Sequence, residues 1–222
     1  MKKTFLLLII LAATIGNSQS LPQTLPMLPK DWQRIYIKDI GSFDLPPTME
    51  IQKGKFREFI DNMKKIHGFD VTQITAQQKG LNEFQKSSAE KYARVMLNTT
   101  FGKKGDFEKL NFNINEFTQT DINDLNLSYK KKTQKEFSES AGVLKLVEWY
   151  PVTVEKVNGM SCIHICYKRQ AQNNPPALVN MYLFPNDDRM YTLTLSYRIS
   201  EGDYWKSDFI TILKSFRITD IR

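Results

Sequence analysis

The sequence predicts an α+β fold in which helices pack on a mainly antiparallel sheet. Apolar and polar residues alternate from Met190 to Ile199, as in a half-buried strand, and helical spacing follows as far as Phe216. Asn158-Gly159, a strong short hairpin signal, separates two runs rich in β-branched residues. Strands and helices also follow one another in blocks joined by hairpins, which favours an α+β class over a parallel sheet.

Residues 1–20 predict a secretion signal. Lys2-Lys3 precede an apolar run at Phe5–Ala13, and small or polar residues follow at Gly16–Ser20. The apolar run is shorter than the ~20 residues that a membrane-spanning helix needs. No other segment approaches that length, so we expect no transmembrane segment after cleavage near Ser18–Ser20. The protein should therefore be exported, to the periplasm or out of the cell.

The remaining chain predicts a proline-containing lead-in at residues 21–30 and a single domain at residues 31–222. The formal net charge of +7 falls to +5 when the two lysines of the signal are removed. A mildly basic balance of this size serves solubility, and we expect no nucleic-acid partner from it.

The first half of the domain predicts short strands and two helices. Strands are expected at 32–37, 41–46, 49–51, 71–81 and 92–100. A helix over 53–66 should pack through an apolar face and end at Gly68; this face comprises Phe56, Phe59, Ile60, Met63 and Ile66. A second long helix should begin at Thr118 or Thr120 and run to about Ser138.

The last third predicts two hairpins, formed by strands at 143–157 with 160–169 and at 177–184 with 190–199. A two-residue Asn-Gly loop pairs Val157 with Met160, and this register sets the faces of the first hairpin. One face is apolar and should be covered by a helix; its pairs are Val154 with Ile163, Val152 with Ile165, and Tyr150 with Tyr167. The other face is mixed, with Glu155 opposite Cys162 and Thr153 opposite His164. It should be half-exposed or line a shallow cleft around Thr153, Cys162 and His164.

The final helix should pack on the sheet and lead into a short closing strand. Ser200 and Asp203 offer capping side chains at its start. Its buried face should comprise Trp205, Phe209, Ile212, Leu213 and Phe216.

The two cysteines, Cys162 and Cys166, should be free thiols. They lie four residues apart on one strand, about 13 Å, whereas the Cα atoms of a disulfide lie within about 7 Å. Cys162, His164 and Cys166 could be considered as zinc ligands, but three in-line residues cannot all reach one tetrahedral ion. A packed sheet face is the better interpretation, and we predict no metal and no cofactor.

The sequence contains no catalytic motif that we recognise, and it has only two histidines, His67 and His164. A basic run, Lys130, Lys131, Lys132 and Lys135, lies in the C-terminal half of the second helix. In one interpretation this run is a solvated helix face, and its positive charges interact favourably with the C-terminal end of the helix dipole. Alternatively, it is an interaction patch for an acidic partner.

Two segments resemble the PsbP-like superfamily. Phe43-Asp-Leu-Pro46 followed by Met49 resembles its N-terminal Phe-x-Leu-Pro strand, and the C-terminal segments resemble its closing hairpin, helix and Ser-Phe strand: Asn180 to Phe184, Tyr191 to Tyr197, Trp205 and Ile212 to Phe216. The resemblance implies an α/β/α sandwich around an antiparallel sheet. It also implies a docking role without an enzymatic active site, as in the extrinsic photosystem II subunit and in the nuclear-import factor that binds the Ran GTPase. With two histidines, this chain has no match for metal sites proposed in photosynthetic members.

The sequence thus predicts a secreted or periplasmic, non-catalytic domain that docks on a protein or envelope partner. The alternative is a small-ligand or lipid carrier that uses the cleft on the mixed sheet face.

Overall fold

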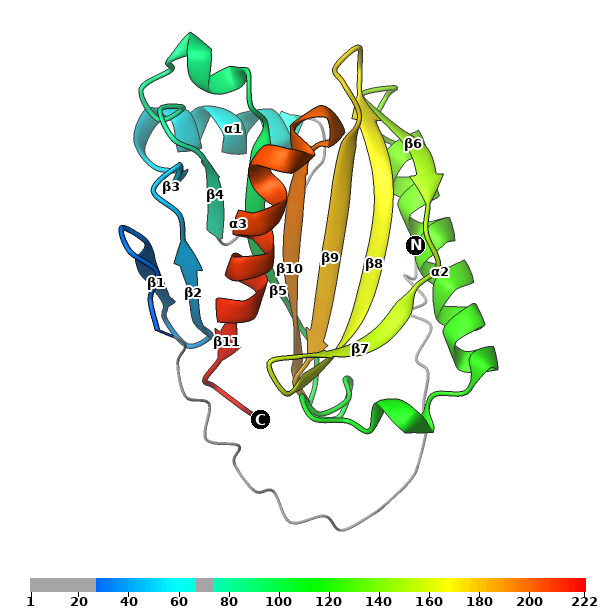
Figure 1. The fold of residues 1–222 in the computed structure, drawn as a ribbon. Helices are drawn as coiled ribbons and strands as arrows, with labels where there is room; N and C mark the ends of the chain where they lie inside the picture. Colours follow the sequence, from blue (N-terminus) through cyan, green and yellow to red (C-terminus); the bar gives the residue numbers. More distant parts are fainter. Residues whose placement is uncertain (1–26, 67–73) are drawn as a thin grey trace.

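The computed structural model describes residues 27–66 and 74–222, and this part of the chain forms two antiparallel sheets with three α-helices (Figure 1). The predicted signal at 1–20, His67 and Gly68 lie outside the described residues. Within these two ranges, no helix combines the length and apolar character needed to cross a membrane.

The larger sheet has eight strands, and every neighbouring pair in it is antiparallel. Its order is β3 (Met49–Ile51), β4 (Ile74–Gln78), β5 (Ala93–Phe101), β10 (Arg189–Arg198), β9 (Ala177–Pro185), β8 (Met160–Ala171) and β6 (Leu144–Trp149). The eighth strand, β7 (Thr153–Val157), pairs with β8 below β6. The predicted antiparallel sheet is therefore confirmed.

The smaller sheet joins the two ends of the described chain. β1 (Gln33–Ile37) pairs with β2 (Gly41–Leu45), and the short closing strand β11 (Arg217–Ile218) pairs with the other edge of β2. A side chain at Gly41 would clash with the carbonyl oxygen of Arg217, so this close pairing requires glycine. The closing strand thus completes the first hairpin rather than the large sheet.

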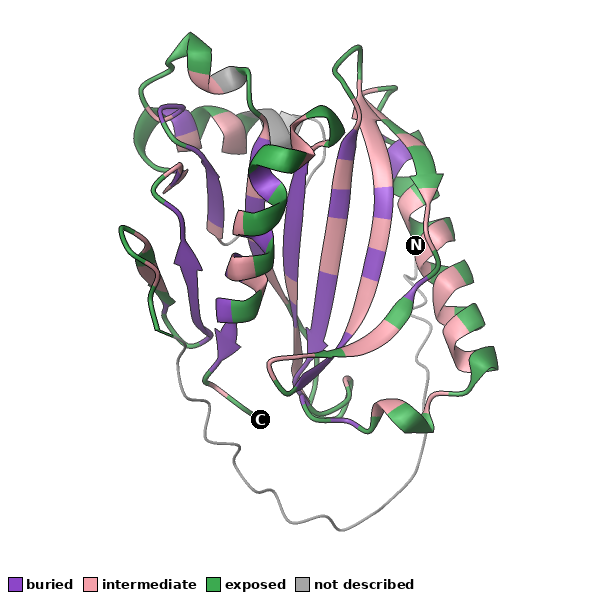
Figure 2. Cartoon of the chain, viewed as in Figure 1, coloured by how far each residue is buried: buried purple, intermediate pink, exposed green. Residues whose placement is uncertain are grey.

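Helices cover both faces of the large sheet, as the predicted α/β/α sandwich requires (Figure 1). On one face, α3 (Gly202–Ser215) covers the main core, which includes Leu193 and Tyr182. On the other face, α2 (Gln119–Ser138) covers a second core that includes Val179 and Leu183. Figure 2 shows the buried residues concentrated in the central strands. α1 (Gly54–Ile66) lies near β3 and β4, at the edge of the sheet.

α3 packs as its spacing predicts but begins differently. Trp205, Phe209, Ile212 and Phe216 are buried in the main core, and Leu213 is partly buried against it. The predicted capping by Ser200 and Asp203 is wrong, because the helix start has no side-chain cap. Instead, a 3₁₀ turn, η3 (Ile199–Glu201), leads directly into α3. The Ile199 carbonyl of this turn accepts a hydrogen bond from the N–H of Gly202, the first residue of the helix.

α2 begins at a reciprocal cap. The Thr118 hydroxyl accepts a hydrogen bond from the Asp121 N–H at 3.2 Å, and the Asp121 carboxylate accepts one from the Thr118 N–H at 2.8 Å. Thr118, rather than Thr120, is therefore the N-cap. These bonds stabilise the charged carboxylate and lower the pKa of Asp121.

The predicted strand over 143–157 is interrupted at residues 150–152. β7 keeps the predicted register, with Thr153 opposite His164. Beyond the interruption Trp149, not Tyr150, lies opposite Tyr167, so that predicted pair is wrong. Pro151 has no N–H to donate to a strand partner.

A side chain of α2 holds this interruption in place. The Asn126 Oδ1 accepts hydrogen bonds from the Trp149 Nε1 at 2.9 Å and from the Val152 N–H at 3.1 Å. The predicted cover of the apolar face is confirmed, because Val152, Ile165 and residues of α2 share the second core.

The predicted strand over 71–81 ends earlier than expected. β4 ends at Gln78, and a turn with Gly80 at φ +93° follows it. Residues 71–73 of that predicted strand lie outside the described part.

Candidate functional site

The predicted cleft residues do not line one cavity. Thr153 and His164 are cross-strand partners, and Thr153 is exposed. Cys162 is fully buried in the main core. The two pockets described below are lined by other residues.

His164 is held by contacts on both ring nitrogens. Its Nδ1 lies 3.4 Å from a carboxylate oxygen of Glu155, and its Nε2 lies 3.0 Å from the amide oxygen of Asn180. The ring also stacks on Tyr182, with centroids 4.4 Å apart and planes 5° apart. A general base needs a nitrogen within reach of a substrate proton, and these contacts use both. The histidine therefore has a packing role on the mixed face.

The two thiols are poorly suited to nucleophilic chemistry. Burial, with a smaller effect from the charge of Glu155, raises the pKa of Cys162 to about 12. Burial also raises the pKa of Cys166, and both residues are free thiols. Since the thiolate is the reactive form, both groups are held in the unreactive state at neutral pH. Among residues 27–66 and 74–222, no three His, Cys, Asp or Glu side chains are arranged to hold a metal ion.

The basic run lies on α2 with its charges partly balanced. Lys132 and Lys135 lie 4.0 and 3.8 Å from Glu136 and Glu139, one helical turn further on. Lys130 is half-buried and Lys131 is exposed. Exposed pairs of this kind add little stability, but they reduce the net positive charge of the helix face. The run is therefore a weaker electrostatic patch than its composition suggests.

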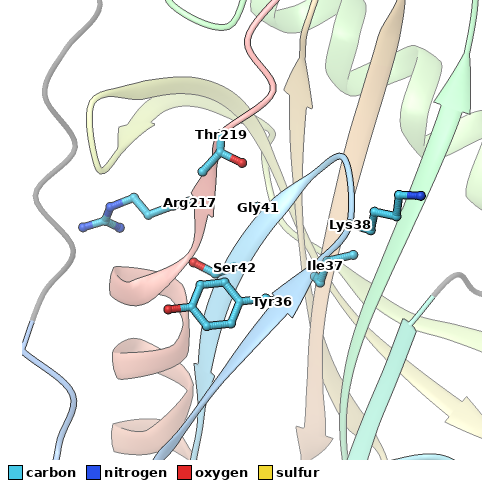
Figure 3. A pocket seen from close by; sticks show the side chains of 7 residues that line it. All are labelled: Tyr36, Ile37, Lys38, Gly41, Ser42, Arg217 and Thr219. Atoms are coloured by element: carbon cyan, nitrogen blue, oxygen red, sulfur yellow. The ribbon is translucent and has the colours of Figure 1, made fainter.

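A pocket of about 320 Å³ lies over β1, β2 and β11 (Figure 3). Lys38 and Arg217 extend from it in opposite directions, and the Tyr36 hydroxyl points outward (Figure 3). The Arg217 guanidinium donates to the backbone oxygens of Lys214 and Phe216 at 2.8 Å. Because Lys38 and Arg217 extend in opposite directions and Arg217 is bonded to two backbone carbonyls, these two charged groups do not converge on one ligand group.

Aromatic side chains gather where α1 meets the turn that contains Phe84. Phe56 is buried and contacts Phe84 edge to face, with ring centroids 5.3 Å apart. Phe59 lies three residues after Phe56, on the same side of the helix, and is 53% exposed. Phe84 is 55% exposed. We call Phe56, Phe59 and Phe84 the α1 aromatic patch.

Phe84 also has an unusual backbone conformation. Its φ of 56° lies in the left-handed region, which bulky residues rarely adopt. The turn is held by the Phe84 N–H, which donates to the Leu81 carbonyl at 3.0 Å, and by the Gln85 N–H, which donates to that of Gly80 at 3.1 Å. The backbone at Phe84 is therefore held in an unfavourable conformation, although its phenyl ring is half-exposed.

Sequence reasoning missed this patch. Helical spacing predicted that Phe59 would be packed, and that prediction is wrong because the side chain is 53% exposed. Phe84 lies between the strands predicted at 71–81 and 92–100, where no helix or strand was expected. A lone phenylalanine among polar residues was the available signal.

Neither a family model nor a curated protein sequence matches the chain. Among solved structures, it is similar to the solution structure of cyanobacterial PsbP (CyanoP) from Synechocystis sp. PCC 6803. The sequence identity is 14%, the match covers 93% of this chain and 98% of that chain, and the TM-score is 0.50. The chain also matches PA94 from Pseudomonas aeruginosa, a protein of unknown function, at 6% identity, 84% and 96% coverage and a TM-score of 0.34. The first likeness confirms a PsbP-like fold, and at this identity it shows the fold alone.

Proposed function

We propose that this chain is an exported, non-catalytic domain that docks on a protein partner through the α1 aromatic patch. The observation that carries the proposal is the half-exposed pair Phe59 and Phe84 beside the buried Phe56. Aromatic side chains are enriched at protein interfaces and supply much of their binding energy. The left-handed turn at Phe84 supports the same role, because strained conformations cluster at functional positions.

The state of the titratable groups supports the non-catalytic part of the proposal. The His164 ring nitrogens are occupied by Glu155 and Asn180, and the Cys162 thiol is buried and protonated. The PsbP-like fold agrees with a domain that works by binding.

The basic run on α2 is a second docking surface to be tested against the first. Two of its lysines face glutamates, so its attraction for an acidic partner should be modest and should fall with salt. The carrier alternative has less support, since Thr153 is exposed while Cys162 is fully buried.

Affinity capture from an envelope extract tests the docking surface. The bait is the exported chain with a C-terminal tag, and the test variant is Phe59→Ser with Phe84→Ser. Tyr36→Ser is the matched control, because Tyr36 is a 73% exposed aromatic residue on β1. We expect the wild type and the control to retain one defined protein at about 0.5 M salt, where charge interactions are screened. The double serine variant should lose at least about tenfold of it.

Three outcomes would overturn the aromatic docking surface. The first is capture of no protein at any salt concentration, and the second is equal capture by the double serine variant. The third is capture that disappears with salt and with Lys131→Glu plus Lys135→Glu, which would place docking on α2. Binding of the bait to vesicles of envelope lipid, equal for all variants, would also contradict a protein partner.

Cell fractionation tests export separately. We expect the protein in the periplasm or the medium, with an N-terminus that begins shortly after residues 18–20. Recovery in the cytoplasm with residues 1–20 attached would refute the export proposal.

A further inference from the structure

A cluster of arginines lies on the α2 face of the large sheet, around Tyr92. Arg94 of β5 is opposite Ser196 of β10, and Arg169 of β8 is opposite Ala177 of β9. These positions meet at the end of the sheet where β8 turns into β9 (Figure 1). The sheet thus brings together side chains that are far apart in the sequence.

The arginines surround the Tyr92 phenol. The Arg169 Nη2 donates to the Tyr92 hydroxyl oxygen at 2.8 Å, and the Arg94 guanidinium lies over the ring, 5.1 Å from its centroid. The Tyr92 hydroxyl also lies 3.3 Å from the Ser196 hydroxyl. Arg94 in turn donates to the side-chain oxygen of Gln78 at 2.6 Å and to the Ala93 carbonyl at 2.9 Å.

None of these partners is a carboxylate. In the part of the chain that the structure describes, neither Arg94 nor Arg169 forms an ion pair. Partly buried guanidinium groups normally have an anionic partner, because removing a charge from water is costly. The cluster therefore carries positive charge that no carboxylate of the described residues neutralises.

The electrostatics of Tyr92 agree with this. Burial by itself would raise the pKa of the phenol, but the charges of Arg169 and Arg94 and hydrogen bonds from Ser196 and Arg169 lower it overall. Burial, with a contribution from the charge of Arg169, lowers the pKa of Arg94. The charge of Tyr92 raises the pKa of Arg169 in turn, so the phenol and Arg169 are electrostatically coupled.

The cluster opens into a pocket of about 180 Å³. Arg169 and Tyr92 form its polar side, and Ala177 and Pro175 contribute apolar wall. Arg169 is half-buried and lines this pocket. Arg198 also lines it, and is paired with Glu201 at 3.4 Å.

We propose that this pocket binds an oxyanion, the phosphate or carboxylate group of a small ligand, with Arg169 as its direct donor. The planar guanidinium matches both groups through paired N–H bonds. Tyr92 orients Arg169, and Arg94 adds positive charge from beneath the ring. The volume exceeds that of a single water, about 30 Å³ in the liquid, by enough to admit such a group. This inference stands apart from the docking proposal, which concerns a different surface.

The test is a titration of the full exported chain followed by amide NMR spectra. The probes are sodium phosphate and sodium succinate, each compared with sodium chloride at equal ionic strength. We expect saturable shifts for phosphate or succinate, centred on the amides of Ala171, Asn174 and Ala177, with a dissociation constant in the millimolar range or tighter. The probe that binds with the higher affinity identifies the class of oxyanion.

Variants then assign the donor. Arg169→Gln should weaken binding at least about tenfold, and Arg169→Lys, which keeps the charge but not the fork, about threefold. Lys104→Gln removes an exposed charge in the turn after β5, at the opposite end of the sheet, and should leave the affinity unchanged. The proposal is overturned if chloride gives the same shifts, if the shifts scatter over surface lysines, or if Arg169→Gln binds like the wild type. Should Arg169→Gln fail to fold, the wild-type shift map and Arg169→Lys decide the question.

Discussion

Truncation of Trp205 to alanine measures how much the packing of α3 contributes to stability. The indole is 1% exposed, and its ring centroid lies 6.2 Å from that of Phe209 and 4.7 Å from that of Tyr204. Replacing a buried aromatic residue by alanine costs about 3–5 kcal/mol, a large share of a typical unfolding free energy of about 5–15 kcal/mol. The Trp205 Nε1 is buried without a hydrogen-bond partner, so its removal relieves part of a penalty of about 1–3 kcal/mol. We therefore expect a loss of about 3 kcal/mol.

The unpartnered N–H also predicts a difference between two variants of the same residue. Trp205→Phe keeps an aromatic ring in the core and removes the unpaired donor, so it should cost less than about 1.5 kcal/mol. Urea denaturation followed by far-UV circular dichroism gives both values, provided that the slope of the unfolding free energy against urea concentration is the same in the variants and the wild type. Ile210→Ala, at a 45% exposed position of the same helix, is the control and should stay within about 0.5 kcal/mol. A loss below about 1 kcal/mol for Trp205→Ala, or equal losses for both variants, would refute this account of the packing.

Two further predictions concern the other core and the buried thiol. Asn126→Ala leaves two N–H groups at the β6–β7 interruption without an acceptor, and should lower the unfolding free energy by about 1–3 kcal/mol. The control is Ser128→Ala, at an exposed position of the same helix. An equal loss of stability in both variants would contradict this prediction. Because burial raises the pKa of Cys162 to about 12, the native thiol should resist a thiol reagent at neutral pH, and rapid labelling before unfolding would be the contrary result. The native pKa of this thiol lies above its unfolded value of about 9, so the native state holds the proton longer. Stability should thus fall as pH rises from about 9 towards 12, and the fall should be shallower in Cys162→Ala.

The elements predicted most accurately are those specified by neighbours in the sequence. Alternation placed the buried face of β10, and helical spacing placed Trp205 and Phe209 against it. The Asn158-Gly159 loop set the register of β7 on β8. In each case the residues that determine the structure lie within one strand, helix or two-residue turn. There the periodicity of apolar side chains and the geometry of the turn determine which residues are buried and which are paired.

Errors arose where a distant residue decides the local structure. The interruption after Trp149 depends on Asn126, which belongs to another element and is bonded only once α2 lies on the sheet. The start of α3 follows from a 3₁₀ turn that no capping motif announces. Helical spacing also described the apolar side of α1 without showing that Phe59 remains half-exposed.

The arginine cluster was missed for the same reason. Arg169 and Tyr92 are 77 residues apart and become neighbours only through the order β5-β10-β9-β8. In the sequence each is an ordinary polar residue at a strand end. Within residues 27–66 and 74–222, neither arginine has a carboxylate partner, and this property arises only in the assembled sheet.

One segment of the chain links the two proposed sites. Residues 80–92 carry Phe84 at one end and Tyr92 at the other, and the Arg198 guanidinium donates to the Glu90 carbonyl at 2.7 Å between them. The Arg198 N–H also donates to the Tyr92 carbonyl at 3.2 Å. An oxyanion held beside Arg198 would therefore lie next to the segment that presents Phe84. If its occupancy changes the affinity for the docking partner, thermodynamic linkage requires the partner to change the affinity for the oxyanion by the same factor.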